Sequence, residues 1–143
     1  MQLTDAYDPQ NIFARILRDE MPSIRVYEDE MTLAFMDIMP QTPGHVLVIP
    51  RAASTNFLTI SPEDAAAVMS TAHKLAPAVQ HAMRAPGFMV AQLNGSAAGQ
   101  TVPHYHMHII PRHAGLEVLG HGTQMADMDE LAEIAKRIRA ALT

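Results

Sequence analysis

The sequence predicts an α+β fold, with about five antiparallel strands and one long helix packed against one face of the sheet. Short apolar segments separated by turn residues are typical of strands, and they occur at 25–28, 32–36, 45–50, 88–93 and 104–110. Between the third and fourth segments, apolar side chains recur at helical spacing over residues 62–83, which predicts the long helix. The chain has 143 residues and 48% hydrophobic content, so we expect a single domain over residues 1–143.

Two shorter helices are expected to flank this core. Asp8-Pro9 is typical of a helix start, and a short helix is expected from there to about residue 21. The long helix begins with the Ser61-Pro62 signature, and Pro77 is expected to kink or weaken it because proline lacks an amide hydrogen. An acidic cap predicts a C-terminal helix over about 127–142.

Composition excludes several classes of function. A formal net charge of −5 and a pI near 5.8 argue against binding to nucleic acids or anionic membranes, which need a positive docking face. The chain has no cysteine, which excludes disulfides, thiolate nucleophiles and cysteine-ligated zinc. It shows neither a signal-peptide pattern nor an apolar run of membrane-spanning length. We therefore expect a cytoplasmic protein.

The most informative segment is 104–112, in which three histidines alternate with apolar residues. Successive side chains on a strand point to opposite faces, so His104, His106 and His108 should share one face. We expect the apolar face to rest on the core and the histidine face to meet solvent or a ligand. The preceding loop, residues 94–101, has small side chains that let backbone N–H groups approach a bound anion.

Three interpretations of the histidines are open. Three neutral imidazoles can hold a zinc ion with an open water position, which predicts a metallohydrolase. An imidazole nitrogen is also a nucleophile toward phosphorus, and flanking imidazoles can donate hydrogen bonds to phosphate oxygens, which predicts phosphoryl or nucleotidyl transfer. The third interpretation is a histidine-rich surface strand without a chemical role.

Residues 104–110 resemble the histidine-apolar-histidine-apolar-histidine-apolar-apolar signature of the histidine triad (HIT) superfamily. The similarity covers about residues 11–113 and is greatest to the Hint-like branch, which consists of small nucleotide-binding hydrolases. Further segments match in the same order: Ile12-Phe13 with Ile16, 27–29, 34–38, 43–50, Asn94-Gly95 and 98–100.

The resemblance implies a role for each of four histidines. His106 would attack the α-phosphorus of a nucleotide and carry the nucleotidyl group until water releases it. His108 would hydrogen-bond the phosphate or the leaving group, and His104 would orient His106 through the backbone. His45 would support the triad from the adjacent strand.

The resemblance also implies the substrate-binding residues. Gln100 and Thr101 would contact the phosphate, with Asn94 as a further polar residue on the phosphate side. Asp37 would bind the ribose hydroxyls, since a carboxylate accepts from two donors. Five apolar side chains would wall the purine: Ile12, Phe13, Ile16, Phe35 and Ile38.

The expected activity is cleavage at the α-phosphorus of purine nucleoside 5′-monophosphate derivatives: phosphoramidates, dinucleoside polyphosphates or acyl nucleotides. No cofactor or catalytic metal is expected, and the resemblance implies a homodimer with the long helix and a strand at its interface. A nucleotide sensor or scaffold with little turnover is the first alternative, and the three-histidine zinc hydrolase is the second.

The chain departs from the family pattern in three places. Members with structural zinc usually carry cysteines near the start of the first helix, where this chain has Asn11 and Ala14, so we expect no such site. Thr101 stands where serine is common. The tail, residues 114–143, matches nothing that identifies a leaving group.

Overall fold

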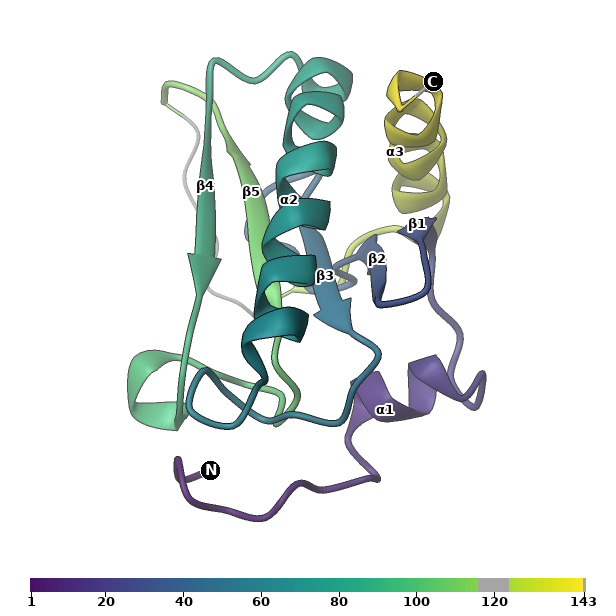
Figure 1. The fold of residues 1–143 in the computed structure, drawn as a ribbon. Helices are drawn as coiled ribbons and strands as arrows, with labels where there is room; N and C mark the ends of the chain where they lie inside the picture. Colours follow the sequence, from purple (N-terminus) through teal and green to yellow (C-terminus); the bar gives the residue numbers. More distant parts are fainter. Residues whose placement is uncertain (116–123, 143) are drawn as a thin grey trace.

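In the computed structural model, which describes residues 1–115 and 124–142, a five-stranded antiparallel sheet is covered by helices (Figure 1). Its strand order is β1-β2-β3-β5-β4, so β1 and β4 are the edge strands. The expected fold class and strand number are confirmed. The strands are β1 Arg25–Glu28, β2 Thr32–Met36, β3 Val46–Pro50, β4 Gly87–Gln92 and β5 Met107–Arg112. The helices are α1 Ile12–Leu17, α2 Pro62–Met83 and α3 Met128–Ala141, with a short 3-10 helix η1 at Ser96–Ala98.

The two faces of the sheet have different covers. Every residue of β2 and β3 is buried, because both strands lie in the sheet interior with side chains packed on both faces. Ala34 and Val48 face the large core under α2 and α3. Leu33 and Leu47 point the other way, into a smaller cluster that includes Phe13 of α1. Figure 1 shows α2 and α3 side by side, with α1 set apart near the lower end of the sheet.

Helix α1 begins later than the sequence predicted. Its N-cap is Asn11, whose side-chain oxygen accepts a hydrogen bond from Ala14 N at 2.9 Å. Asp8 instead accepts from Gln10 N at 2.9 Å, in a turn that precedes the helix. The prediction was wrong because asparagine caps a helix as well as aspartate does, and here the second of two candidate caps is used. The helix ends at Leu17, short of the expected residue 21.

The two other α-helices have the expected extents. Ser61 caps α2 by accepting a hydrogen bond from Asp64 N at 3.1 Å, and the helix continues through Pro77 to Met83. Helix α3 is capped by Asp127 and packs against α2 and β1. Residues 116–123 and 143 of the predicted tail lie outside the described residues. Within the described ranges, the helices are too short or too polar to cross a membrane.

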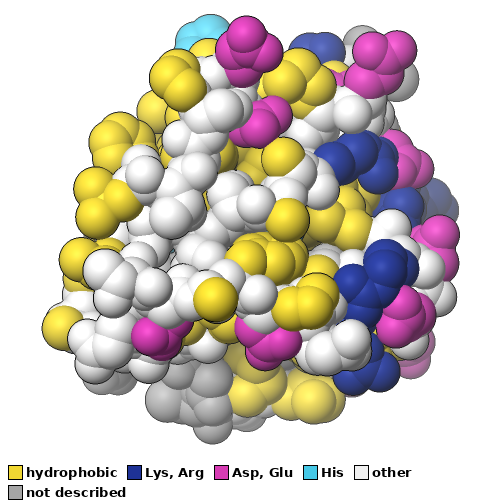
Figure 2. Space-filling view, turned by 60° about the horizontal axis from the view of Figure 1, so that its bottom comes forward, with side chains coloured by type: hydrophobic (Ala, Val, Ile, Leu, Met, Phe, Trp, Pro, Cys, Tyr) yellow, Lys and Arg dark blue, Asp and Glu magenta, His cyan; other side chains and the backbone are white. Residues whose placement is uncertain are grey.

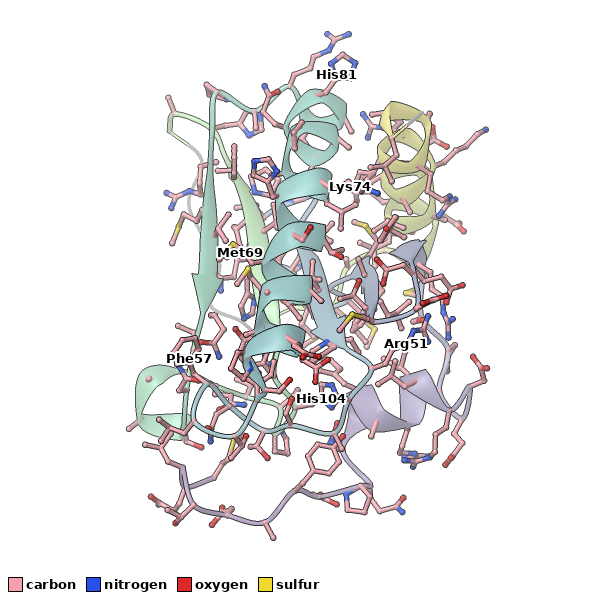
Figure 3. The ribbon with its side chains drawn as sticks, in the orientation of Figure 1. Arg51, Phe57, Met69, Lys74, His81 and His104 are labelled. Atoms are coloured by element: carbon pink, nitrogen blue, oxygen red, sulfur yellow. The ribbon has the colours of Figure 1, made fainter. Side chains whose placement is uncertain are left out.

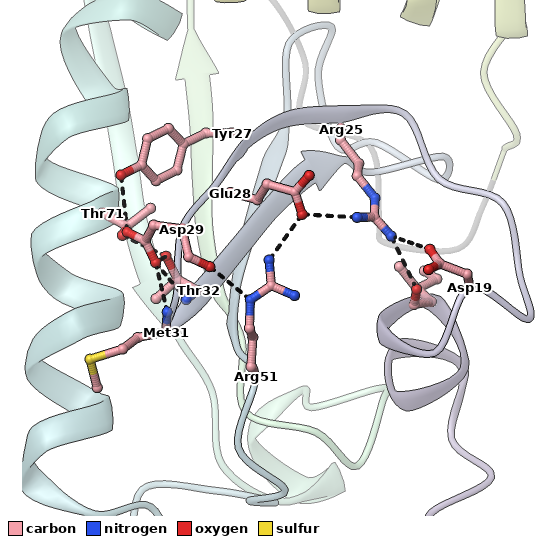
Figure 4. A network of polar contacts seen from close by, with 10 residues as sticks. Asp19, Arg25, Tyr27, Glu28, Asp29, Met31, Thr32, Arg51 and Thr71 are labelled. Atoms are coloured by element: carbon pink, nitrogen blue, oxygen red, sulfur yellow. Dashed lines mark hydrogen bonds and ion pairs between the residues drawn. The ribbon is translucent and has the colours of Figure 1, made fainter.

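A polar network ties the first hairpin to the end of β3 (Figure 4). The Asp29 carboxylate accepts hydrogen bonds from the backbone N–H groups of Met31 at 2.9 Å and Thr32 at 2.8 Å, which closes the turn between β1 and β2. Arg51 follows β3 and donates to the carbonyl of Asp29 at 2.8 Å and to the Glu28 carboxylate at 2.9 Å. The turn and the end of β3 are therefore held together.

The predicted histidine strand is shorter and more buried than expected. Strand β5 begins at Met107, so His104 and His106 precede its first paired residue. The apolar face is as predicted, because Tyr105, Met107 and Ile109 all lie in the core under α2. The histidine face was expected to meet solvent or a ligand. His104, His106 and His108 are 0%, 3% and 4% exposed, so this face does not meet solvent, and its contact with a ligand stays a prediction.

Substitution of Gly44, in the turn before β3, would test how tightly this region is packed. Gly44 has a φ of +91°, and a Cβ atom there would lie 2.6 Å from Met83 Cγ. Gly44→Ala should therefore lower the free energy of unfolding by about 1–3 kcal/mol, measured by urea denaturation. Gly87→Ala is the matched control, since a Cβ there has no atom within 4 Å and should change stability little. Equal stability of the two variants would contradict the described turn.

Candidate active site

The triad lies on the face of the sheet that α1 covers. His108 pairs with Leu47 across β3 and β5, and Leu47 pairs with Phe35 across β2 and β3. Side chains directly opposite in an antiparallel ladder project to the same face, so the His108 ring shares a face with the cluster around Phe13. Figure 3 labels His104 at the lower end of the sheet, where the N-terminal segment passes beneath it.

The hydrogen-bond pattern assigns the tautomer of His106. Its Nδ1 lies 2.6 Å from the carbonyl oxygen of His104. A carbonyl oxygen only accepts, so Nδ1 carries the hydrogen and Nε2 carries the lone pair. Nε2 is therefore the nucleophilic atom of the ring, and the carbonyl raises its electron density by polarising the Nδ1–H bond.

His104 is held at both ring nitrogens. Its Nε2 donates to the carbonyl oxygen of Pro50 at 2.9 Å, and its Nδ1 lies 2.7 Å from the Tyr7 hydroxyl oxygen. Burial lowers the pKa of His104, with the Pro50 hydrogen bond acting in the opposite direction. The ring is therefore neutral at pH 7. Burial also raises the pKa of Tyr7, so the phenol stays protonated and donates to Nδ1.

His45 and His108 form a second directed pair. The backbone N–H of Gln41 donates to His45 Nδ1 at 3.0 Å, which places the hydrogen of the neutral ring on Nε2. His45 Nε2 lies 2.8 Å from His108 Nδ1, so His108 accepts there and carries its own hydrogen on Nε2. The Asp37 carboxylate lies 3.5 Å from His45 Nε2, and both side chains are buried.

A cavity of about 290 Å³ is lined by Phe13 and Asp37, which contact His106 and His45, although the four histidines themselves do not line it. Its lining includes six residues predicted from the sequence: Ile12, Phe13, Ile16, Phe35, Asp37 and Ile38. Phe13 connects the cavity to the nucleophile, because its ring lies 5.0 Å from the His106 ring in an edge contact. The remaining lining residues were not predicted: Met21, Pro22, Ser23, Ile24, Met36, Met39, Leu47, Val102 and Met128.

The loop from Asn94 to Thr101 is stabilised mainly from within. The Gln100 side chain accepts from Gly95 N at 2.7 Å and donates to the carbonyls of Thr55 and Val102 at 2.7 and 3.0 Å. The backbone N–H groups of Gly95, Ser96, Ala98, Gly99 and Gln100 all donate to protein oxygens. The expectation that this loop turns its N–H groups toward an anion is therefore not met by those five groups.

Asn94 and Thr101 lie at the two ends of that loop. The Asn94 side-chain oxygen accepts from Phe57 N at 2.7 Å and from Gln92 Nε2 at 2.8 Å. Asn94 therefore joins the end of β4 to the loop that leads into α2. Thr101 is exposed. The predicted contacts of Asn94, Gln100 and Thr101 with phosphate stay predictions.

Sequence reasoning missed two site residues from distant segments. Tyr7 reaches His104 from 97 positions away, and Met128 reaches the cavity from the start of α3. A lone tyrosine and a helical methionine have no local spacing that indicates such contacts. His45, in contrast, was predicted from the sequence. It directly follows the turn at Pro43-Gly44 and is the first residue of the segment 45–50, which was expected to be a strand.

The metal interpretation fits the hydrogen-bond pattern poorly. Asp37, His45 and His108 offer ligand atoms that lie within 4.8 Å of one another. However, the Gln41 N–H requires the lone pair of His45 at Nδ1, which leaves hydrogen rather than a lone pair at the Nε2 that would face the ion. The three-histidine zinc set is disfavoured too, since both ring nitrogens of His104 are engaged by Tyr7 and Pro50.

The lowered pKa of His104 predicts a pH dependence of stability. The unfolded histidine takes up a proton below about pH 6.5, whereas the buried ring resists it, so the free energy of unfolding should fall as the pH drops from about 7 to 5. His104→Gln keeps a donor and an acceptor but does not titrate, so its curve should be flatter. Urea denaturation across this pH range measures the difference. His73→Gln, at an exposed position, is the control, and its free energy of unfolding should depend on pH as that of the wild type does. Equal slopes for His104→Gln and wild type would contradict it.

Solved structures of similar proteins match nearly the whole chain, and two of them serve as examples. A Hit-like protein from Bartonella henselae, described as involved in cell-cycle regulation, has a TM-score of 0.88 at 49% identity, covering 95% of this chain and 99% of that one. A zinc-bound histidine triad family protein from Mycobacterium smegmatis has a TM-score of 0.82 at 35% identity, covering 93% of each chain. In this chain, Asn11 caps α1 and Ala14 has no ligand atom, so these positions do not fit a structural zinc ion.

Comparison with the sequences of known proteins points to the same family as the solved structures do. Adenosine 5′-monophosphoramidase HNT1 of Saccharomyces cerevisiae is 35% identical over 138 residues, which cover 94% of this chain and 84% of the yeast protein. A family model described as the HIT domain matches residues 18–115. That range contains the five strands, α2, His45 and the complete triad. The protein belongs to the HIT domain family.

Proposed function

We propose that this protein is a nucleoside phosphoramidase, which cleaves the bond between the α-phosphorus and the leaving group of a purine nucleoside 5′-monophosphate derivative. The observation that carries the proposal is the 2.6 Å hydrogen bond from His106 Nδ1 to the His104 carbonyl, which makes Nε2 a nucleophile beside a nucleotide-sized cavity. The name of the yeast relative, adenosine 5′-monophosphoramidase, supports the substrate class.

In the first step, the lone pair of His106 Nε2 forms a bond to the α-phosphorus. The bond from phosphorus to the leaving nitrogen breaks, and that nitrogen keeps the electron pair and takes up a proton that originates from solvent. The nucleotidylated ring is cationic, because Nδ1 keeps its hydrogen. The His104 carbonyl stabilises this charge, since a hydrogen bond from a charged donor is stronger than one from a neutral donor.

His108 would stabilise the negative charge on phosphorus. Its Nε2–H can donate to a non-bridging oxygen or to the leaving group, and its ring lies 5.0 Å from that of His106. His45 holds His108 in this tautomer through the 2.8 Å contact to Nδ1. In the second step, water forms a bond to the phosphorus, the bond from phosphorus to His106 Nε2 breaks, and Nε2 keeps the electron pair. The water releases a proton to solvent, and His106 leaves as a neutral ring.

The cavity would hold the nucleoside. The aliphatic side chains of Ile12, Ile16 and Ile38 would provide apolar walls for a purine, and the Phe13 ring would link these walls to the His106 ring, which it contacts edge-on. The Asp37 carboxylate lies at the cavity wall next to His45, where it would accept hydrogen bonds from both ribose hydroxyls. The base would therefore bind in the apolar part and the phosphate at the histidines.

Adenosine 5′-phosphoramidate tests the activity. Wild type should release AMP, and a nucleotidyl adduct should appear on His106 by mass spectrometry after an alkaline quench. His106→Asn should lose at least about a thousandfold in kcat while still binding AMP, because it removes the nucleophile but keeps the pocket. His81→Asn, at an exposed position of α2, is the control and should retain activity.

The alternative is a nucleotide sensor or scaffold with the same pocket. Tight AMP binding by wild type, measured by calorimetry, with neither AMP release nor an adduct on His106 would support that alternative and reject the phosphoramidase. Failure to bind AMP would reject both. The cytoplasmic location stays a prediction.

We also propose a homodimer formed through β4 and α2. Edge strand β4 exposes Phe88, Met89 and Val90 at 43%, 44% and 46%, and Met69 is 53% exposed on the β4 side of α2 (Figure 3). Hydrophobic side chains stand along the left edge of the molecule in Figure 2, the side on which β4 lies. An uncovered apolar edge strand invites pairing with another chain, and a second copy would cover it.

Sedimentation tests the dimer. Wild type should have about twice the chain mass of 15.7 kDa at micromolar concentration. Val90→Lys should shift the protein toward monomer, because a charge on the edge strand opposes pairing. Met31→Lys changes an exposed methionine near the opposite edge and should leave the mass unchanged. A monomeric wild type would contradict the proposal.

A further inference from the structure

The N-terminal segment, residues 1–7, is attached to the elements that build the site. It passes below the sheet and α1 in Figure 1. The carbonyl of Leu3 accepts a hydrogen bond from Asn56 Nδ2 at 3.0 Å, and the carbonyl of Met1 accepts one from Ser96 N at 3.3 Å. Its last residue, Tyr7, reaches the buried ring of His104. This segment therefore contacts the loop after β3, the loop before the triad and the triad itself.

The hydrogen bond between Tyr7 and His104 can run in only one direction. The carbonyl oxygen of Pro50 accepts from His104 Nε2, which leaves the lone pair of the neutral ring on Nδ1. The Tyr7 hydroxyl, 2.7 Å away, must then be the donor. Its ring also makes an edge contact with the imidazole, with centroids 5.7 Å apart at 66°. The bond is therefore compatible only with the tautomer that Pro50 sets, and together with the ring contact it holds the orientation of His104.

We propose that Tyr7 is a positioning residue for the reaction, which acts through His104 to hold the carbonyl that orients the His106 nucleophile. The proposal rests on the phosphoramidase function above. It follows from where strand β5 begins: the ladder between β3 and β5 starts at Met107, so no strand pairing fixes the backbone of His104. The backbone carbonyl that receives the His106 Nδ1–H lies outside the sheet.

Other contacts must therefore fix that carbonyl. The Tyr105 N–H, which belongs to the same peptide unit as that carbonyl, donates to the carbonyl of Ser54 at 2.8 Å. The His104 N–H donates to the carbonyl of Val102 at 2.9 Å, and the His104 side chain is anchored by Pro50 on one nitrogen and Tyr7 on the other. Without the Tyr7 hydroxyl, the ring keeps one anchor and can rotate about it. The His104 carbonyl and the His106 ring would then be less precisely oriented, and a small misorientation of a nucleophile lowers the rate strongly.

Tyr7→Phe removes the hydroxyl and keeps the ring. We expect kcat for adenosine 5′-phosphoramidate to fall by about 10- to 100-fold, with KM within about twofold, because the nucleotide cavity is not changed. Tyr27→Phe is the matched control: it removes a tyrosine hydroxyl that donates to Asp29 at 3.0 Å on β1, and both constants should stay at wild-type values. Circular dichroism establishes the temperature range in which each variant is folded.

A second measurement does not depend on turnover. Nitrogen-15 NMR of the histidine rings should show wild-type His104 as a single neutral tautomer with its hydrogen on Nε2. In Tyr7→Phe the His104 Nδ1 signal should shift, because that nitrogen loses its hydrogen-bond donor, and the His106 Nδ1–H signal should shift or broaden. Tyr7→Leu removes the ring as well and should show the same spectral change. Tyr27→Phe should give the wild-type spectrum.

Three outcomes would overturn the proposal. An unchanged kcat in Tyr7→Phe would show that the tyrosine only anchors the N-terminal segment. A rise in KM alone would place its effect on binding rather than on the nucleophile. An unaltered His104 and His106 spectrum would show that the hydroxyl does not orient the rings. If wild type itself lacks activity, the phosphoramidase function fails, and the spectra alone decide whether Tyr7 orients the two histidines.

Discussion

The site depends on the hydrogen bond from His106 Nδ1 to the carbonyl oxygen of His104. A backbone carbonyl cannot act as a donor, so this contact determines which nitrogen of the nucleophile carries the lone pair. The same logic applies to the other rings. The carbonyl of Pro50 fixes the hydrogen of His104, and the backbone N–H of Gln41 fixes that of His45. Because these partners belong to the main chain, the fold itself sets all four tautomers, and His108 follows from its contact with His45.

The unequal covering of the sheet explains why the imidazoles and the cavity are neighbours. Helices α2 and α3 occupy one face, which receives the apolar side chains between the histidines. The opposite face is covered by the short helix α1, whose six residues are too few to fill it. The register that sets His108 opposite Leu47 brings the triad to this thinner side. The space that α1 leaves between its own apolar residues and β2 forms part of the cavity, so the cavity and the nearby imidazoles arise from one packing arrangement.

Local patterns in the sequence predicted the elements well. The period of two placed Tyr105, Met107 and Ile109 in the core, because alternation on an extended chain depends only on near neighbours. Of the two alternatives for the histidine face, solvent or a ligand, local patterns could not exclude solvent, since burial of this face depends on the packing of Phe13 from a distant helix. The start of α1 was misplaced, because Asp8 and Asn11 are equally suitable caps and tertiary packing chose between them.

In the candidate site, too, residues in local motifs were predicted from the sequence, whereas contacts between distant segments were not. The sequence resemblance selected Asp37 and five apolar residues, and the structure brings all six to one cavity. It also selected Gln100 for the phosphate, whereas the Gln100 side chain is engaged with the backbone of its own loop and of Thr55. Contacts made by Tyr7 and Met128 cross most of the chain, and only the folded structure reveals them.

The buried pair of His45 and His108 sets a condition on proton transfer. With both rings neutral, the pair holds one hydrogen on each Nε2, and giving away the hydrogen of His108 would leave an anion in a buried site. The pair can act as an acid only after it has gained a proton. The Asp37 carboxylate, 3.5 Å from His45 Nε2, favours that added positive charge. If the protein has the proposed function, Asp37 would therefore have two tasks that compete. A ribose bound to its oxygens would weaken its hold on the protonated pair, so nucleotide binding and proton supply would be coupled through one side chain.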